Sequence, residues 1–335
     1  MKHHKTALVA CICFLLLIFS MTLALSVGSY HITPADVFQT LLGHGEKLQQ
    51  FTIYQIRLPR IILAIIVASA LAVSGGVLQN ITRNPLAEPG IIGINTGAAL
   101  FVVLWISSGS AAYYSALSLS TVLFIPLIAM IGSLVSVAFI YLFAYKKGIR
   151  PVRFILTGIG VNAGISAVIS FYQLNMSKGD YNQVLTWTNG SLWGSSWNYI
   201  LLTFPIILFL ILLLLIRSRT LDVLGLGDEL ASGIGVSVQR EMLFFLITAS
   251  LLAAVATSVA GNIAFLGLLG PQIAKRLVGP VNRRMLPIAA AISAIILILA
   301  DTAAKNLFSP IEIPVGIIVS VLGVPYFIYL MLKRK

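Results

Sequence analysis

Ten long runs of apolar residues, separated by short polar stretches, dominate this chain. A run of about 20 apolar residues can cross the hydrocarbon core of a bilayer as an α-helix, which satisfies its own backbone hydrogen bonds in lipid. The pattern therefore predicts an all-α, polytopic membrane protein with a single transmembrane domain over residues 1–335. The predicted helices cover residues 7–27, 61–80, 91–107, 119–144, 154–174, 199–216, 242–260, 263–279, 286–304 and 314–332.

Two of these runs are less regular than the rest. The run 91–107 is short, and Gly267, Gly270 and Pro271 interrupt the run 263–279. Broken backbone is costly where it faces lipid, so an interrupted span usually lines a cavity or packs closely against its neighbours. We expect one of these two environments for 263–279.

Composition agrees with a membrane protein. Hydrophobic residues make up 59% of the 335 residues and charged residues only 10%, whereas a soluble chain carries roughly 25% charged residues. Such a chain cannot cover a water-facing surface, and it is too apolar to be disordered. Cys11 and Cys13 both lie inside the first apolar run, which excludes a disulfide framework and a cysteine metal cluster.

The distribution of basic residues predicts the orientation. In a soluble protein the formal net charge of +12 would suggest nucleic acid as a partner, but here the cations lie in short segments between apolar runs, so we expect no nucleic acid. Ten spans place both termini on one side, and a cytoplasmic placement puts most of the 22 lysines and arginines inside, as the positive-inside rule requires. The cations that this orientation leaves outside are Lys47, Arg57, Arg60, Lys178 and Lys305.

Two segments between the spans are long enough to carry function, and a third has a distinctive composition. Residues 28–60 are predicted to lie outside and residues 217–241 in the cytoplasm. The external stretch 175–198 is aromatic and nearly uncharged. It predicts a short interfacial helix around 183–192 with its tryptophans at headgroup level.

Motifs for catalysis and metal binding are missing from the sequence. No lysine follows a glycine, so the chain lacks the Gly-Lys-Ser/Thr loop that binds nucleotide phosphates, and it is not expected to hydrolyse ATP by itself. The four histidines are scattered near the N-terminal end, which does not favour a metal site. Asp301, the one acid inside a predicted span, is four residues from Lys305 and is expected to pair with it. Ion-coupled transporters usually carry acids near mid-bilayer, so the sequence disfavours a proton- or sodium-driven mechanism.

Two cations on the outer side lie close together, in the sequence Ile56-Arg-Leu-Pro-Arg60. Pro59 suits the start of a helix, and arginines three residues apart project to one side of its first turn. The alternative is snorkelling to the interface, but cations are disfavoured on this side of the membrane. The pattern favours docking of an external acidic partner on Arg57 and Arg60.

Two polar segments are predicted on the cytoplasmic side. Residues 83–90 read Arg-Asn-Pro-Leu-Ala-Glu-Pro-Gly, which predicts a turn between the second and third spans. Residues 224–236 contain four glycines, within a segment whose charges nearly cancel. Their pattern predicts two short helices with tight turns, which form either an ordinary loop or a docking element for a cytoplasmic protein.

The fifth span contains closely spaced small residues. Gly160 and Gly164 form a small-xxx-small pair that permits two helices to approach closely. We favour helix packing for this pair over lining of a transport pathway, although the two roles are compatible.

Several motifs in combination resemble a known family. They read Arg57-Leu-Pro-Arg60, Ala70-Leu-Ala-Val-Ser-Gly75 with Gln79, Arg83-Asn-Pro-Leu-Ala-Glu-Pro89 with Gly93, Gly225-Leu-Gly-Asp-Glu-Leu-Ala231, Leu299-Ala-Asp-Thr302, Glu312-Ile-Pro-Val-Gly316 and Gly323-Val-Pro-Tyr-Phe327. Over nearly its whole length the chain thus resembles the vitamin B12 and iron–siderophore permease family (FecCD-like) of ABC importers.

The resemblance implies a BtuC-like fold of ten helices in a multi-pass protein of the bacterial cytoplasmic membrane. It also implies a second permease subunit in a homo- or heterodimer, two cytoplasmic ABC ATPase subunits that bind ATP-Mg, and an extracellular or periplasmic substrate-binding protein. The chain itself is expected to bind no cofactor and no metal. The expected cargo is a ferric siderophore. The alternatives are cobalamin or haem within the same family and, outside it, an ATP-independent secondary transporter or a receptor that only anchors a partner complex.

The resemblance also implies roles for individual residues. Binding-protein docking is assigned to Arg57, Arg60 and Lys305. Coupling to the ATPase is assigned to Gly225, Leu226, Gly227, Asp228, Glu229, Leu230, Ala231, Ser232 and Gly233. The cytoplasmic gate is assigned to Ile149, Arg150, Pro151, Val152 and Arg153. Lining of the pathway is assigned to Thr157, Gly160, Asn162 and Gly164 of the fifth span, together with residues 183–194.

One stretch departs from the family pattern. The common form has a proline near position 262, a glycine near 264 and a histidine near 272, where this chain has Asn262, Ala264 and Gln272. We expect the same fold, but a role shared through that histidine is called into question. The departure is compatible with one half of a heterodimer whose subunits have diverged.

Overall fold

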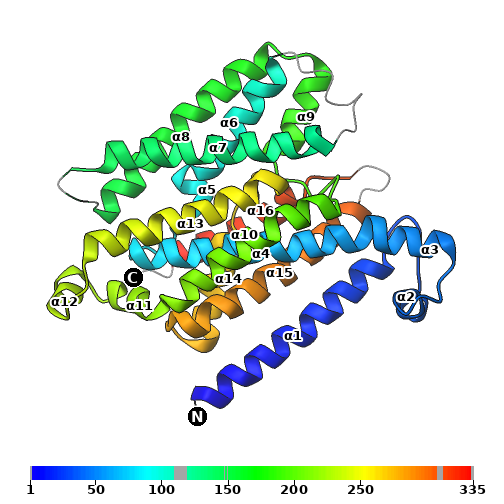
Figure 1. The fold of residues 1–335 in the computed structure, drawn as a ribbon, viewed down its shortest axis with the longest axis horizontal. Helices are drawn as coiled ribbons and strands as arrows, with labels where there is room; N and C mark the ends of the chain where they lie inside the picture. The colour runs from blue at the N-terminus through cyan, green and yellow to red at the C-terminus, as the bar shows by residue number, and fades with distance from the viewer. Residues whose placement is uncertain (1, 109–118, 147, 149, 308–311, 333–335) are drawn as a thin grey trace.

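The chain folds into a bundle of helices, and the computed structural model describes residues 2–108, 119–146, 148, 150–307 and 312–332 (Figure 1). Within these residues every regular element is helical, which confirms the all-α prediction. In chain order the elements are α1 (Lys2–Ser26), α2 (Pro34–Leu41), α3 (Lys47–Phe51), the π-helical turn η1 (Thr52–Arg57), α4 (Leu58–Ile81), α5 (Pro89–Ile92), α6 (Ile94–Ser107), α7 (Leu119–Ala144), α8 (Pro151–Leu174), α9 (Lys178–Thr188), α10 (Trp197–Ile216), α11 (Ser218–Gly225), α12 (Asp228–Gly233), α13 (Val238–Ala260), α14 (Leu266–Val278), α15 (Asn282–Asn306) and α16 (Val315–Leu332).

Each of the ten apolar runs contains a helix, but two are shorter than a full span. Among the described residues, eight helices are long and apolar enough to cross a membrane. The run 91–107 is divided into α5 and α6 at Gly93, whose φ is 95°. The run 263–279 becomes helical only after Phe265, whose φ is 66°. A residue in the left-handed region cannot continue a right-handed helix, so both spans are shortened by local backbone geometry.

The centre of the bundle is α4, which packs against α13, α14 and α15 (Figure 1). In its most apolar stretch 83% of the residues are buried, against 17% for α8. This contrast separates a core helix from one that leaves most of its apolar surface uncovered within the single chain.

The interrupted span packs closely against α4, which is one of the two environments expected for it. A Cβ atom added to Gly75 of α4 would lie 1.9 Å from the carbonyl oxygen of Gly267. Gln79, one turn further along α4, donates a hydrogen bond from its Nε2 to that same oxygen at 3.0 Å. The irregular backbone of α14 is therefore hydrogen-bonded inside the protein, away from lipid.

Replacing Gly75 with alanine is expected to destabilise the protein by about 1–3 kcal/mol, because α4 and α14 must separate to admit the methyl group. Gly160 is a matched control, since a Cβ added there meets no atom within 4 Å. Gly160→Ala removes only the helix penalty of glycine and is expected to stabilise by roughly 0.5–1 kcal/mol. Thermal unfolding of the two purified variants in detergent measures both effects, and equal Tm values would contradict the close contact.

The helices α6, α7, α8 and α9 form a second layer beside the α4 bundle (Figure 1). Its own apolar core includes Val103 of α6, Ala129 of α7, Ile169 of α8 and Val184 of α9. The predicted interfacial helix at 183–192 is α9, which begins and ends earlier. The start is fixed by Ser177, whose hydroxyl accepts a hydrogen bond from the Asp180 amide at 3.2 Å and so caps the helix.

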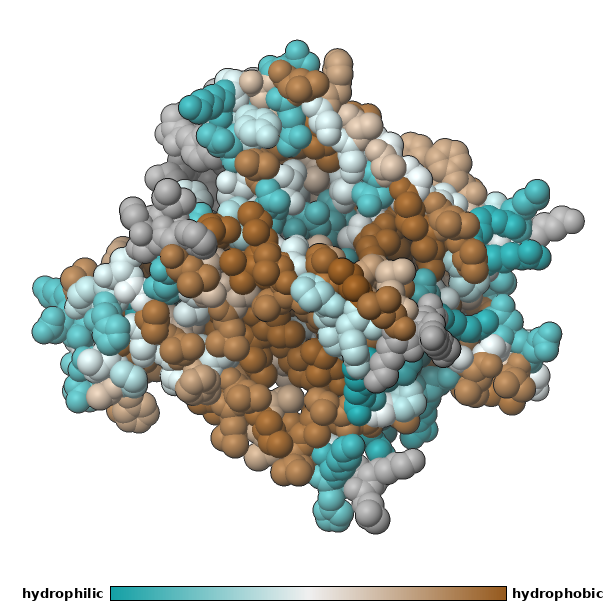
Figure 2. Space-filling view, turned by 180° about the vertical axis from the view of Figure 1, so that it is seen from behind, coloured by the Kyte–Doolittle hydropathy of each residue, from teal (hydrophilic) through white to brown (hydrophobic). Residues whose placement is uncertain are grey.

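The two ends of the bundle carry the short helices. The elements α11 and α12 lie at one end, and α2 and α3 lie at the other (Figure 1). The prediction of two short helices within 217–241 is confirmed. The opposite face of the molecule is apolar over its middle and more hydrophilic toward these ends (Figure 2), as expected for a protein whose middle lies in lipid.

Candidate functional site

Arg57 is the last residue of η1, directly before α4, and is 7% exposed. Its Nη1 donates to the carbonyl oxygen of Leu25 and its Nη2 to that of Tyr30. Leu25 lies in the last turn of α1, where carbonyl groups have no helical partner. Gly28 leaves room for the guanidinium, because a Cβ there would lie 2.8 Å from Nη2. Arg57 therefore fixes the end of α1 and the chain that follows it.

The prediction that a helix starts at Pro59, with Arg57 and Arg60 on one side of its first turn, is wrong in one respect. Helix formation does not start at Pro59, because α3, η1 and α4 run continuously from Lys47 to Ile81. In the π-helical turn before the proline, the amide of Leu58 donates to the carbonyl of Ile53, five residues back. Proline has no amide hydrogen, and the wider turn accommodates it inside a helix. Arg57 and Arg60 consequently bind different partners instead of forming one paired site.

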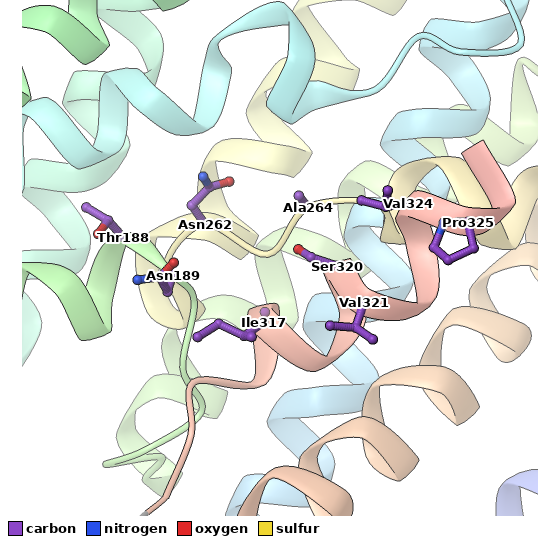
Figure 3. A pocket seen from close by; sticks show the side chains of 10 residues that line it. Thr188, Asn189, Asn262, Ala264, Ile317, Ser320, Val321, Val324 and Pro325 are labelled. Carbon is purple, nitrogen blue, oxygen red and sulfur yellow. The ribbon is translucent and has the colours of Figure 1, made fainter. Parts of the chain in front are cut away.

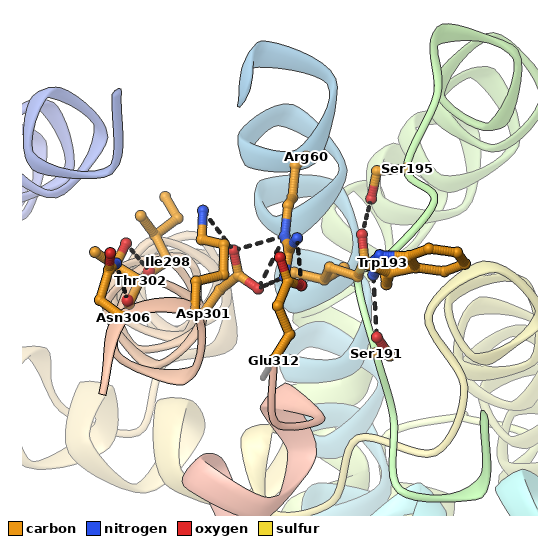
Figure 4. A network of polar contacts seen from close by, with 11 residues as sticks. Arg60, Ser191, Trp193, Ser195, Ile298, Asp301, Thr302, Asn306 and Glu312 are labelled. Carbon is orange, nitrogen blue, oxygen red and sulfur yellow. Dashed lines mark hydrogen bonds and ion pairs between the residues drawn. The ribbon is translucent and has the colours of Figure 1, made fainter. Parts of the chain in front are cut away.

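Arg60 belongs to a network of charges that joins α4 to α15 and to the chain before α16 (Figure 4). Its Nε and Nη2 donate to the Asp301 carboxylate at 2.9–3.1 Å. Its Nη1 donates to Oε2 of Glu312 at 3.0 Å. The expected pair of Asp301 with Lys305 is confirmed, with 3.4 Å between Nζ and Oδ2.

The four members of this network differ in exposure. The side chains of Arg60, Asp301 and Lys305 are 11%, 6% and 15% exposed, and that of Glu312 is 40% exposed. The two cations are formally balanced by the two anions. Because Glu312 alone reaches well into solvent, its bond to Arg60 is the member of the network that an external carboxylate can replace most easily.

The end of the bundle that carries α11 and α12, predicted to be the inner end, exposes an apolar patch on the segment 224–236. The side chains of Leu226, Leu230 and Ile234 are 65%, 62% and 66% exposed. The tight turns around them form at Gly227 and Gly235, with φ values of 122° and 88°, which residues with a side chain rarely adopt. We name Leu226, Leu230 and Ile234 the inner apolar patch.

Polar contacts attach the longer segment 217–241 to the bundle at three places. The carboxylate of Asp222 in α11 accepts hydrogen bonds from the backbone and side-chain nitrogens of Asn282 at 2.8 and 2.6 Å. Arg217 pairs with Glu241 at 2.8 Å. Arg83, in the connection between α4 and α5, pairs with Asp228 of α12. These contacts attach the segment to α13, to α15 and to the connection that follows α4.

The described gate residues predicted from the sequence lie at and just before the start of α8. Ile149 lies outside the described residues. Arg150 precedes α8 and Pro151 is its first residue, as proline prefers. Val152 is 70% exposed, and Arg153 donates from Nη1 to the carbonyls of Ala144 and Lys146, both at 3.5 Å. Gly148, before α8, lies beside the start of α13, because a Cβ added to it would lie 3.0 Å from the side chain of Gln239.

The glycines of α8 do not pack as predicted. A Cβ added to Gly160 or Gly164 meets nothing within 4 Å, so the preference for close packing of this pair is wrong within the chain. The close approach occurs at Gly158, where a Cβ would lie 2.6 Å from the carbonyl oxygen of Ile92. The face of α8 that bears Gly160 and Gly164 points away from α5 and α6. The spacing of the glycines in the sequence does not show which face of α8 meets these helices.

An open pocket of about 520 Å³ lies between the end of α9, the α13–α14 loop and α16 (Figure 3). Its polar groups come from Thr188, Asn189, Asn262 and Ser320, and its remaining lining is apolar or glycine. No charged residue is among the lining residues. Thr188 and Asn189 belong to the predicted 183–194 segment, but none of the four predicted residues of α8 lines this pocket.

Two positions that depart from the family pattern, Asn262 and Ala264, lie in the pocket wall. The third, Gln272, is 7% exposed and donates from Nε2 to Oε1 of Gln79 at 2.7 Å and to the carbonyl of Pro85 at 3.1 Å. The departure was visible in the sequence, but its link to a pocket and to the α4–α5 connection was not. Among the described residues no group of histidine, cysteine and acidic side chains could hold a metal.

Glu88, which precedes α5, was not singled out from the sequence. It is 3% exposed, and its Oε2 accepts a hydrogen bond from the backbone amide of Phe265 at 3.0 Å. Burial raises the pKa of the Glu88 carboxyl to about 7, and the hydrogen bond from Phe265 opposes this rise. None of the ion pairs among the described residues includes Glu88, and acidic side chains are almost never fully buried unless they are paired.

Comparison with known proteins gives a consistent result. The model of the FecCD transport family matches residues 16–333. The iron(3+)-hydroxamate import system permease protein FhuG of Bacillus subtilis is 42% identical over 336 residues, covering 100% of this chain and 99% of that protein. The iron-uptake system permease protein FeuC of the same organism is 37% identical and covers 93% of each chain.

A solved structure supports the same fold. An inward-facing conformation of a metal-chelate type ABC transporter matches with a TM-score of 0.83 and 30% sequence identity. The match covers 96% of this chain and 97% of that chain.

Proposed function

Since this chain belongs to the FecCD transport family and has the fold of a BtuC-like permease, we propose that it is the membrane permease subunit of a binding-protein-dependent ABC importer of ferric siderophores. The observation that carries the proposal is the match along the whole chain, from the outer arginines through the segment 224–236 to the end of α16. Energy comes from separate ATPase subunits, since the sequence contains no phosphate-binding loop.

A ferric siderophore is the cargo that the pocket and the relatives favour. FhuG is described as a permease for iron(3+)-hydroxamate and FeuC as one for iron uptake. The lining of the pocket offers hydroxyl and amide groups but no charge. Three hydroxamate anions neutralise Fe³⁺, and such an uncharged chelate can pass an uncharged wall without a counter-ion. Weak polar contacts also suit a permease, which must release its cargo.

The inner apolar patch and α11–α12 are the surface for the ATPase. Three large apolar side chains exposed at a polar end of the bundle are typical of a protein interface. The positive-inside rule places this end and both termini in the cytoplasm. The residues from Gly225 to Gly233 then move with the ATPase, while residues 150–153 close the pathway beside α13.

The outer network receives the binding protein. Arg60 is held by Asp301, and a carboxylate of the binding protein replaces Glu312 on its Nη1. Lys305 supplies a second cation beside it. Arg57 has a supporting part, because its guanidinium is already bound to the chain between α1 and α2. Thr157 and the exposed glycines of α8 face a second permease subunit and line the shared pathway with it. Asn162 lies on the other side of α8, where a Cβ added to Gly93 would lie 3.2 Å from its Cβ, so its assigned role in lining the pathway is not supported by this arrangement.

The proposal is tested by reconstituting the chain with its ATPase, a second permease subunit and the binding protein in proteoliposomes. Radiolabelled ferric hydroxamate siderophore is expected to accumulate only with ATP inside the compartment that holds the ATPase. Accumulation without the ATPase would identify a secondary transporter. Uptake of cobalamin or haem, with none of ferric siderophore, would overturn the cargo, and no uptake of any kind would favour an anchoring receptor.

A further inference from the structure

The connection between α4 and α5 has no role in the assignments above, although it contacts both the coupling segment and the wall of the pocket. We name residues 83–88 the Arg83–Glu88 turn. It contains the sequence Arg-Asn-Pro-Leu-Ala-Glu. Its two charged residues stand at opposite ends, and each one binds a different moving part of the proposed transporter.

The first end of the turn binds the two coupling helices together. The guanidinium of Arg83 donates to the carbonyl oxygen of Leu224, in the last turn of α11, at 3.1 and 3.3 Å. It also pairs with the carboxylate of Asp228, the first residue of α12. One side chain therefore holds the joint between α11 and α12. Arg83 itself has a φ of 50°, so the turn is fixed in a backbone conformation that few residues adopt.

The turn between its ends is hydrogen-bonded internally. The amide of Asn84 donates to the carbonyl of Gln79 at 3.1 Å, and the side-chain oxygen of Asn84 accepts from the Leu86 amide at 3.1 Å. Pro85 restricts the backbone further. Gln272 of α14 is bonded to Pro85 and Gln79 at once. Such a segment transmits a displacement instead of absorbing it.

The second end of the turn binds the start of α14. The carboxylate of Glu88 accepts the hydrogen bond of the Phe265 amide. Phe265 has a φ of 66°, and its ring contacts Phe327 of α16, with 6.3 Å between the ring centroids. A Cβ added to Gly323 of α16 would lie 2.4 Å from the same ring. Phe265 is thus held between Glu88 and α16.

The loop that Glu88 holds is part of the pocket. Asn262 and Ala264 of this loop line the pocket, as do Ser320 and Val324 of α16. Asn262 is in turn bonded through its Oδ1 to Nδ2 of Asn95 in α6 at 2.9 Å. A shift of the turn relative to the bundle would therefore move two walls of the pocket, the α13–α14 loop and α16.

We propose that the Arg83–Glu88 turn transmits the motion of the coupling helices to the pocket, with Arg83 and Glu88 as positioning residues. The inference rests on the proposed function, since it requires a partner ATPase that moves α11 and α12. Phe265 has a φ of 66° and is held there by Glu88, and in this proposal displacement of the turn releases that hold. The turn couples ATP hydrolysis to release of the chelate.

The test measures ATP hydrolysis and uptake of ferric hydroxamate in the same proteoliposomes, with the complete complex. The Glu88→Gln variant keeps the shape of the side chain but removes its charge, and Asp228→Asn does the same at the other end. Glu88→Gln is expected to retain assembly and ATP hydrolysis while uptake per ATP hydrolysed falls about tenfold, the size of effect expected when a charged hydrogen bond becomes a neutral one. Asp228→Asn, in the segment that meets the ATPase, is expected to lower the same ratio in the complexes that assemble. A purely structural role would lower the amount of complex and leave this ratio unchanged.

Two further variants make the result specific. Glu46→Gln is the same substitution at an exposed residue before α3 at the opposite end, and it is expected to leave the ratio unchanged. The double variant Glu88→Gln/Asp228→Asn is expected to be no worse than the poorer single variant, because both act through one turn. Wild-type ratios in both single variants, or additive losses in the double variant, would overturn the inference while the proposed function stands. A wild-type complex that transports no chelate would remove both.

Discussion

Replacing Leu226 and Leu230 together with aspartate is expected to detach the chain from its ATPase and to abolish uptake. Both leucines are more than half exposed at the end of the bundle that carries α11 and α12, so the substitution leaves the core of the permease intact. Burying one leucine contributes roughly 1.5–3 kcal/mol. Losing two therefore weakens the association by about 3 kcal/mol or more, which is on the order of a hundredfold. Co-purification of the ATPase with the tagged chain measures the effect.

The matched control for this variant is Leu48→Asp. Leu48 is 57% exposed on α3 at the opposite end of the molecule, so it presents the same residue type at similar exposure. The ATPase is expected to co-purify fully with this variant. If the inner variant also retains a wild-type amount of ATPase, α11–α12 is not the coupling surface.

Replacing Arg60 with glutamine is expected to cost about 3–5 kcal/mol of stability and to eliminate stimulation by the binding protein. The substitution leaves the largely buried Asp301 carboxylate with Lys305 as its remaining cation, and removing one partner of a buried ion pair is strongly destabilising. It also removes the cation on which an external carboxylate can replace Glu312. Thermal unfolding in detergent and the affinity for the binding protein measure the two effects.

A double variant separates these two effects. Arg60→Gln with Asp301→Asn removes one charge of each sign, so Lys305 and Glu312 remain balanced and most of the lost stability is expected to return. The affinity for the binding protein should stay low, because the docking cation is still missing. Wild-type affinity in the double variant would refute the docking role of Arg60, and a Tm as low as that of Arg60→Gln would refute the network as the source of stability.

Contacts between residues close together in the sequence could be predicted from it, whereas contacts between distant residues could not. The pair Asp301–Lys305 lies within one helical turn, and its formation is dictated by spacing alone. The two helices of 217–241 are likewise marked by their own glycines. By contrast, Arg60 meets an acid 241 positions away in the sequence. No local pattern indicates that Asp301 already binds the guanidinium of Arg60, the residue predicted to dock the binding protein.

The same difference explains the glycines of α8. Spacing identified Gly160 and Gly164 as able to pack closely, which is correct for any helix that meets a partner on that face. Which face meets α5 is decided by the rotation of α8 about its axis. In the folded chain that rotation brings Gly158 to the carbonyl of Ile92 and leaves the other two glycines uncovered.

The sequence by itself determined that the chain is a membrane-embedded helical protein, which segments are helical and which family it belongs to, because apolar run length, turn residues and charge bias act locally or through the solvent. The tertiary structure alone decided how α9, the α13–α14 loop and α16 meet in one pocket, and how Glu88 reaches the amide of Phe265. Those contacts join residues far apart in the sequence, and their geometry is set by the packing of whole helices against one another.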